Sequence, residues 1–244
     1  MVSHLKRGVT WLLKNAHYVF CIFVVLAAIT SVGNFQVLLS KQTLSPSDQG
    51  SSVLIRFVWD AALLVGFMCQ HTLMAASFVK DKLGTWLRLT ISQRLLYTGV
   101  SSLTLLFCIL KWQSIPEAGL WVIDTREHWF LWLIFLLLHV VTWLFWSLQV
   151  VLMDVGEMLG VSQIHRYYKD QPQPLTGGRT SVKLQDLYSH VRHPGTLLVT
   201  LLLWVHPLMT LDRFLLACWF SCYMIFRHST TDTHYTFGFV TTPT

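Results

Sequence analysis

The sequence predicts an all-α, polytopic membrane protein with about six transmembrane helices, the last two forming a short helical hairpin. Three observations lead to this fold class. Of the 244 residues, 53% are hydrophobic and only 12% are charged, whereas about a quarter of the residues in a soluble domain are charged. The mean hydropathy is +0.51. Several apolar stretches also reach the roughly 20 residues that a helix needs to cross a bilayer.

The six predicted spans follow one another along the chain. The first four are long apolar runs. The last two are shorter than a typical span, and His206-Pro207 and Asp212-Arg213 stand at the turn between them. Pro207 favours a turn here because proline restricts the residue before it and disfavours continued helix. These two segments are therefore predicted to form a tight hairpin. The spans cover about residues 18–39, 53–78, 95–112, 129–153, 195–209 and 212–227.

One connection, residues 154–194, is longer than the others. Its first part, "DVGEMLGVSQIHRYY", is predicted to continue as helix, and "QPQPLTGGRTS" then marks a turn rich in proline and glycine. The connections at residues 40–52 and 113–128 are predicted to be simple loops. Residues 1–244 are therefore predicted to form a single integral membrane domain.

The basic residues lie mainly in alternate connections. Twelve Lys and Arg residues fall in the N-terminal segment and in the loops after the second and fourth spans, against at most five on the opposite side. Positive residues beside membrane spans stay on the cytoplasmic side, so both termini are predicted to be nucleoplasmic or cytoplasmic. Because the charge follows the loops and forms no single basic stripe, the net charge of +6 predicts no direct nucleic-acid binding.

The cysteine and glycine patterns point to no familiar ligand site. All five cysteines fall inside predicted spans, and no Cys-x-x-Cys pair is present. The chain also contains neither a Gly-x-Gly-x-x-Gly fingerprint nor a Gly-x-x-x-x-Gly-Lys phosphate loop. No metal site is predicted, and a nucleotide-like ligand would need a site of another kind.

Ionisable residues inside the predicted spans have two interpretations. Asp60 and His71 are eleven residues apart, which places them within about 20° on one helix face. They either face the interior of the bundle or reach the headgroups from opposite ends of the span. His139 lies near mid-span, where a bond to a neighbouring helix would satisfy it. Haem ligation would need a second axial ligand at the same depth, and the one candidate is His206, whose depth the sequence does not give.

The stretch "LYSHVRHPGTLL" opens the fifth span. In the structural interpretation, Pro194 occupies the first turn of the helix and Arg192 belongs to the basic flank. In the chemical interpretation, Arg192 holds a carboxylate through two hydrogen bonds, and His193 binds an anionic or hydroxylated ligand beside the helix N-terminus.

This stretch resembles the isoprenylcysteine carboxyl methyltransferase family, whose members bind S-adenosylmethionine partly through an Arg-His-Pro element. The resemblance implies a methyltransferase-like fold, in which Arg192 holds the cofactor carboxylate. Its substrate would be a membrane-embedded or lipidated molecule that accepts a methyl group on a thiol or carboxylate. The residues implied to bind the cofactor are Tyr188, His190, Arg192, His193 and Pro194. The catalytic residues are not identified.

Several separate motifs across roughly residues 56–228 are similar to the nurim family of multispanning inner nuclear membrane proteins. They are "WDAALLVGFMCQHTLMAASFVK", "RLLYTGVSSLTL", "LHVVTWLFWSLQVVLMDVGEMLGVSQIHRYY" and "LYSHVRHP". This resemblance implies a protein of the inner nuclear membrane that contacts the lipid bilayer and other nuclear envelope proteins. It further implies a structural or interaction role without a cofactor. The alternative function is that of an S-adenosylmethionine-dependent methyltransferase.

Overall fold

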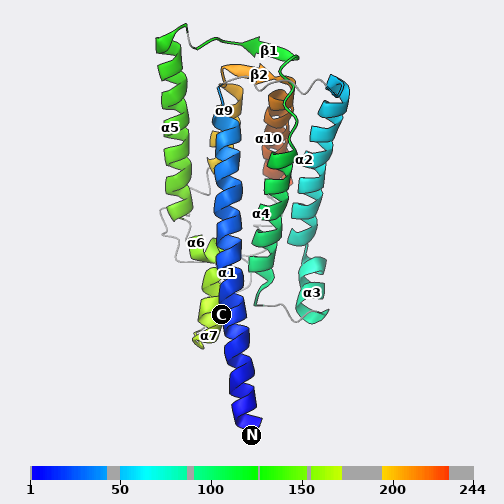
Figure 1. Cartoon of the computed structure of the whole chain (residues 1–244), viewed down its shortest axis with the longest axis vertical. Coiled ribbons are helices and arrows are strands. Elements are labelled where there is room, and N and C mark those ends of the chain that lie inside the picture. Colours follow the sequence, from blue (N-terminus) through cyan, green and yellow to red (C-terminus); the bar gives the residue numbers. More distant parts are fainter. Residues whose placement is uncertain are drawn as a thin grey trace, which may run out of the picture. The chain divides into compact units, whose positions relative to one another are not determined.

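The computed structural model describes residues 2–42, 50–86, 91–125, 127–152, 155–171 and 194–230. It confirms the predicted all-α membrane fold, because helices make up most of the described chain (Figure 1). Among these residues, four helices are long and apolar enough to cross a membrane. They are Gly8–Ser40, Val53–Ala75, Gln93–Lys111 and Trp129–Val151.

The chain forms two compact units. The first unit comprises Met1–Lys41, Val58–Gln113 and Leu148–Gln185, and the second comprises Gln42–Phe57, Ser114–Ser147 and Asp186–Thr244. Whether the two units form one membrane domain depends on how they are joined, so the single membrane domain stays a prediction.

In the first unit, the long first helix packs along the third span (Figure 1). A small core of Cys21, Val24, Leu95 and Ile164 lies between these helices and α7. A Cβ on Gly99 would lie 3.0 Å from Val24 Cγ2, so the glycine permits this close approach. The helices that contribute to the unit are α1 (Val2–Ser40), α2 (Val53–Ala75), α3 (Ser77–Trp86), α4 (Gln93–Lys111), α6 (Val155–Leu159) and α7 (Val161–Tyr168).

The predicted helical segment after the fourth span is helical, but it is divided at Gly160. This residue has a φ of 85°, a left-handed conformation that glycine adopts without a steric penalty. A Cβ at this position would also lie 2.7 Å from the backbone nitrogen of Leu95. Gly160 therefore both turns the chain between α6 and α7 and lets the turn rest against the start of α4.

The second unit combines a helical pair with a short two-stranded sheet. Helices α9 (Pro194–Trp204) and α10 (Leu211–Thr230) pack against each other (Figure 1), as the predicted hairpin requires. Strands β1 (Gly119–Val122) and β2 (Leu208–Thr210) are antiparallel, with Trp121 opposite Met209. Helix α5 (Trp129–Leu152) supplies most of its residues to this unit and the rest to the first.

The structure differs from the prediction at two helix ends and in one connection. The fifth span was predicted over 195–209, but the helix ends at Trp204 and the chain becomes extended after Pro207, which lacks an N–H and restricts the preceding residue. The second span was predicted to end at residue 78, yet α2 ends at Ala75 and α3 follows as a separate helix. The connection predicted as a simple loop at 113–128 contains β1.

The spans expose most of their apolar side chains. Only 22% of the most apolar window of α1 and 11% of that of α5 are buried within the chain. Such helices would aggregate in water, whereas lipid tails cover them without cost. The environment of these helices is therefore a lipid bilayer.

Replacing Gly160 by Ala should destabilise the first unit. The left-handed conformation costs a residue with a Cβ about 1–2 kcal/mol, and the contact with Leu95 requires a backbone shift in addition. We expect a clearly lower midpoint in thermal unfolding of the detergent-purified protein. The matched control is Gly66→Ala, since a Cβ there meets no described heavy atom within 4 Å. It should be neutral or stabilising by up to about 1 kcal/mol. Equal midpoints for Gly160→Ala and the native chain would contradict this role.

Candidate functional site

Four of the residues predicted to bind a cofactor, Tyr188, His190, Arg192 and His193, lie outside the described residues. The fifth, Pro194, is the first residue of α9. Proline suits this position because its fixed φ is already helical and the first turn needs no N–H from it. The helix predicted to start at Pro194 is therefore present, while the part of Arg192 and His193 in cofactor binding stays a prediction.

A pocket lies in the first unit where α2, α3, α4 and α7 meet. Its volume is about 480 Å³, within the usual range for sites that bind small molecules. Helix α2 contributes its last two residues and α4 its first ones, so the pocket lies at one end of two membrane spans. The lining residues are Met74, Ala75, Lys80, Leu83, Gln93, Arg94, Tyr97 and Gln163.

The polar side of this pocket carries two positive charges. Lys80 and Arg94 are both exposed, and the described lining contains no carboxylate. The Gln93 side chain donates a hydrogen bond to the Lys80 carbonyl oxygen (2.7 Å), which joins α4 to α3. Arg94 Nε donates a longer bond to the Met158 carbonyl oxygen (3.4 Å). These bonds fix the backbone and the guanidinium stem on either side of the pocket.

Tyr97 connects the pocket to a polar cluster between α2 and α4. Its hydroxyl lies 2.8 Å from His71 Nε2, and Phe67 stacks on the imidazole. Ser101 Oγ accepts a hydrogen bond from Gln70 Nε2 at 3.4 Å. His71 therefore bonds to the neighbouring helix, which decides between the two interpretations of its position in favour of the interior.

A second set of side chains holds α7 against α1 and α4. His17 Nε2 lies 2.9 Å from Ser92 Oγ, next to the start of α4, and His17 Nδ1 lies 2.9 Å from the Tyr168 hydroxyl. Burial, together with the nearby Tyr167 and Tyr18, raises the pKa of Tyr168. The hydroxyl therefore keeps its proton at neutral pH and remains able to donate a hydrogen bond.

An ion pair joins α6 to α7. Glu157 is buried, with 8% of its surface exposed, and its carboxylate accepts a hydrogen bond from Arg166. A buried carboxylate needs such a partner, since an unpaired charge in a low dielectric is costly. The pair holds the two short helices on either side of Gly160 and so supports the pocket wall that carries Gln163.

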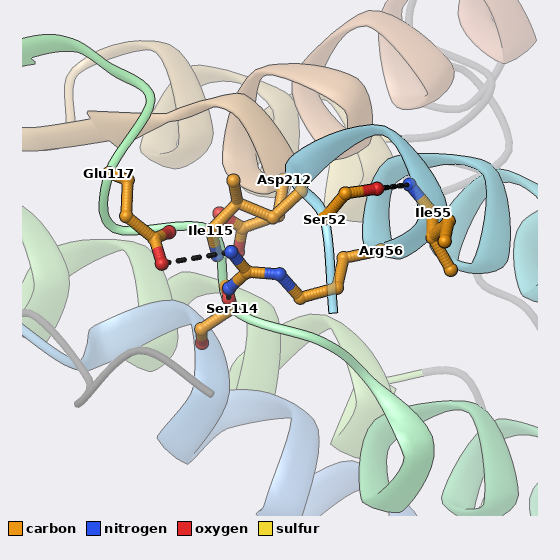
Figure 2. A network of polar contacts seen from close by, with 7 residues as sticks. All are labelled: Ser52, Ile55, Arg56, Ser114, Ile115, Glu117 and Asp212. Carbon is orange, nitrogen blue, oxygen red and sulfur yellow. Dashed lines mark hydrogen bonds and ion pairs between the residues drawn. The ribbon is translucent and has the colours of Figure 1, made fainter. Parts of the chain in front are cut away.

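The second unit contains a network of charged groups around residues 114–117 (Figure 2). Arg56 is 3% exposed. It donates one hydrogen bond to Glu117 Oε1 and another to the Ser114 carbonyl oxygen, both 2.8 Å long. From α10, Asp212 Oδ1 accepts a hydrogen bond from the Ile115 backbone N–H (3.2 Å). The first turn of α2 and the first turn of α10 therefore both bind this connecting segment.

His206 ties the turn between α9 and α10 to β1. Trp121 Nε1 donates to the His206 carbonyl oxygen (2.9 Å), and Arg213 Nη1 lies 2.8 Å from His206 Nε2. Because a guanidinium only donates hydrogen bonds, this ring nitrogen must be an acceptor. The imidazole is therefore neutral and carries its proton on Nδ1, which donates to the Leu208 carbonyl oxygen (2.9 Å).

His139 contacts the ring of His206 edge to face, with 5.6 Å between centroids. The bond expected to a neighbouring helix is absent among its described contacts; instead His139 Nδ1 bonds the Phe135 carbonyl oxygen of its own helix (2.7 Å). The Nε2 atom of His206, a nitrogen that would serve as a haem ligand, accepts the Arg213 hydrogen bond. The two histidines form a packing contact and do not face each other across a haem site.

Asp60 is fully buried, with an exposed fraction of 0%. Its Oδ1 accepts a hydrogen bond from the Gln113 backbone N–H (2.9 Å), just after the end of α4. Headgroup solvation, one of the two interpretations of the sequence, is therefore wrong for this residue. Asp60, on the same face of α2 as His71, therefore connects α2 to the segment that follows α4.

Sequence reasoning missed the pocket in the first unit. It assigned Lys80 and Arg94 to the basic flank that sets orientation, and it gave Tyr97 no role. The available signal was the presence of both cations and a tyrosine around one short connection between two spans. Among the residues that the structure describes, no group of three His, Cys, Asp or Glu side chains is arranged to hold a metal ion.

Comparison with known proteins identifies relatives that share one name. The chain is 34% identical over 175 residues to "Nurim homolog" of Drosophila pseudoobscura pseudoobscura, covering 72% of this chain and 68% of that protein. It is 33% identical over 184 residues to "Nurim" of Bos taurus and 32% identical over 182 residues to "Nurim" of Homo sapiens, covering 74% of this chain and 68% of each relative. No family model and no solved structure matches the chain.

The hydrogen bond of Asp212 yields a prediction about stability. Asp212→Ala removes the acceptor of the Ile115 N–H, and Ile115 is fully buried, so the unpaired donor should cost about 1–3 kcal/mol of unfolding free energy. Asp212→Asn keeps a carbonyl oxygen in place and should cost less. Denaturant unfolding in detergent compares the two. Equal losses for Asp212→Ala and Asp212→Asn would show that the hydrogen bond to Ile115 is not what stabilises this segment.

Proposed function

The chain belongs to the nurim family, and from this premise we propose that it is a multispanning protein of the inner nuclear membrane with a structural or interaction role. The observation that carries the proposal is the similarity to proteins named Nurim over about three quarters of the chain, 74% for the bovine relative. The motifs described above resemble a family of the inner nuclear membrane, which gives the proposed location. The proposed partners are the lipid bilayer and other nuclear envelope proteins.

The use of the buried polar groups supports a structural role. In the second unit, Arg56 and Asp212 bind backbone groups of residues 114–117, and His206 binds Arg213 and the backbone of Leu208. Groups engaged in this way stabilise a particular arrangement of segments. These hydrogen bonds give the charged side chains a structural role, so their presence does not require that they act on a substrate.

An S-adenosylmethionine-dependent methyltransferase is the second candidate function. The observation in its favour is that α9 begins at Pro194, the last residue of the Arg-His-Pro element that resembles the methyltransferases. Against it, Gly195 and Thr196 follow Pro194, where the methyltransferases that this stretch resembles carry an aromatic and a small residue. This difference favours the structural role.

The proposed location can be tested by removing the basic N-terminal segment. Described contacts that pack α1 against the start and middle of α4 lie outside this segment, with His17 bonded to Ser92 and Val24 packed on Gly99. Deleting residues 2–14 should therefore leave a fluorescent fusion at the nuclear rim. Gly99→Leu should reduce the rim signal, because its side chain cannot fit beside Val24. A reticular distribution of the deletion variant, when it is inserted normally in the membrane, would refute the proposal that the packed spans retain the protein.

Calorimetric titration of the detergent-purified protein with S-adenosylmethionine separates the two functions. For a structural protein we expect no saturable binding, and Arg192→Ala should change neither the heat signal nor the folding. A cofactor site would lose a bidentate bond worth about 1.5–3 kcal/mol in that variant, and its affinity would fall at least about tenfold. The control is Lys169→Ala, which removes an exposed charge from the same connection. Saturable micromolar binding that is weakened by Arg192→Ala and unaffected by Lys169→Ala would establish the methyltransferase-like site instead.

A further inference from the structure

We propose that the pocket between α2, α3, α4 and α7 binds a phosphate monoester presented by an anionic phospholipid. This inference concerns a site distinct from the Arg192-His193-Pro194 stretch, and it does not depend on the nuclear location. It rests on three features of the pocket, namely its depth in the membrane, the charges at its polar side and its apolar wall.

The pocket lies at the boundary of the hydrocarbon region. Two of its lining residues, Met74 and Ala75, are the last of one apolar span, while Gln93 and Arg94 are the first of another. The ends of a span lie where acyl chains give way to headgroups. A ligand in this pocket therefore occupies the depth at which the phosphate of a phospholipid is found.

The charge of the pocket suits an anion. Lys80 and Arg94 come from different helices, are exposed and have no carboxylate beside them in the described lining. Asp81, the next residue to Lys80, is not part of that lining. Basic pockets between membrane helices bind phosphorylated headgroups, and a guanidinium can form two hydrogen bonds to one phosphate. The Tyr97 hydroxyl adds a polar group on the same helix as Arg94.

The remaining wall suits the lipid part of such a ligand. Met74, Ala75 and Leu83 provide apolar surface beside the two cations. A volume of about 480 Å³ accommodates a phosphate with a glycerol unit and the first carbons of an acyl chain, since sites for small molecules begin at about 300 Å³. A soluble phosphate ester would leave the apolar wall uncovered, which favours the membrane lipid as the source of the phosphate.

The pocket is held in shape without the ligand. The bond from Gln93 to the Lys80 carbonyl oxygen connects α3 to α4, and the Tyr97 hydroxyl is fixed by His71 of α2. Gly160 rests on the backbone of Leu95 and thereby holds α7 beside the start of α4. Since the walls are already joined, binding need not order them, which lowers the entropic cost of association.

The test is a native mass spectrometry titration of the full detergent-purified chain with dioleoyl phosphatidic acid, using dioleoyl phosphatidylcholine as the neutral reference lipid. The variant is Lys80→Gln with Arg94→Gln. The matched control is Lys82→Gln with Lys111→Gln, which removes the same charge from α3 and α4 at positions outside the lining. Lys80→Gln alone serves as a second variant that leaves the bond from Arg94 to Met158 intact.

We expect the double pocket variant to bind phosphatidic acid roughly thirtyfold more weakly, because each basic side chain contributes about 1 kcal/mol near an anionic lipid. The control should lower the affinity much less than the double pocket variant, because neither Lys82 nor Lys111 lines the pocket, and Lys80→Gln alone should give an intermediate loss. Lys80→Gln alone and the control variant should unfold at the native temperature without added lipid, and Lys80→Gln alone decides the comparison if loss of the Arg94–Met158 bond lowers the unfolding temperature of the double variant. Equal affinities of the pocket variants and the native chain, or equal losses in the pocket and control variants, would overturn the proposal.

Glycerol 3-phosphate distinguishes the source of the phosphate. If the ligand is a lipid, this soluble ester should compete with phosphatidic acid only weakly, and Leu83→Ser should weaken phosphatidic acid binding without changing competition by the ester. Competition at the affinity of the lipid itself would overturn the lipid source and assign the pocket to a soluble phosphate ester.

Discussion

A charged or hydrogen-bonding group that leaves water without a partner costs several kcal/mol, and in hydrocarbon the cost cannot be met by solvent. Several such groups in the described chain are bonded across segments that are distant in sequence. Asp60 of α2 accepts a hydrogen bond from the Gln113 N–H just after α4, and Asp212 of α10 accepts one from the Ile115 N–H, four residues before β1 begins. In lipid, apolar contact between helices gains little over contact with acyl chains. These polar bonds and the close approach at Gly99 therefore specify which segments pair.

The same constraint explains the small sheet. Pro207 ends the run that continues from α9, and the extended residues after it leave backbone N–H and C=O groups that need partners. Strand β1 supplies them, with Ile123 N donating to the Pro207 carbonyl oxygen and Trp121 pairing with Met209. His206 completes the turn, because its side chain bonds both the Leu208 carbonyl oxygen and Arg213. The sheet is short because it only has to satisfy the backbone of one turn.

The parts of the fold that sequence reasoning recovered are those determined by local composition. The apolar runs that became α4 and α5 differ by at most two residues from the predicted spans at either end, since hydrophobicity and span length are local properties. The β1–β2 pairing was missed because two strands of four and three residues carry too little alternation to be recognised. The break at Gly160 was missed because its cause is the distant Leu95 backbone. Of the predicted cofactor residues, only Pro194 belongs to a described element.

The basic residues illustrate why a binding site in a membrane protein is difficult to infer from sequence. Lys80 and Arg94 stand where the positive-inside rule expects cations, so their positions are already explained by orientation. The basic residues that set the orientation of a membrane protein lie at the same depth as the lipid phosphates. A cation that sets orientation and a cation that binds a headgroup therefore occupy the same positions in the sequence. What separates them is the three-dimensional arrangement, in which two cations from α3 and α4 line one pocket with an apolar wall, whereas Lys82 on the same α3 helix does not. The orientation of the protein depends on how many basic residues a loop carries, whereas binding depends on which of those side chains lie together around one pocket.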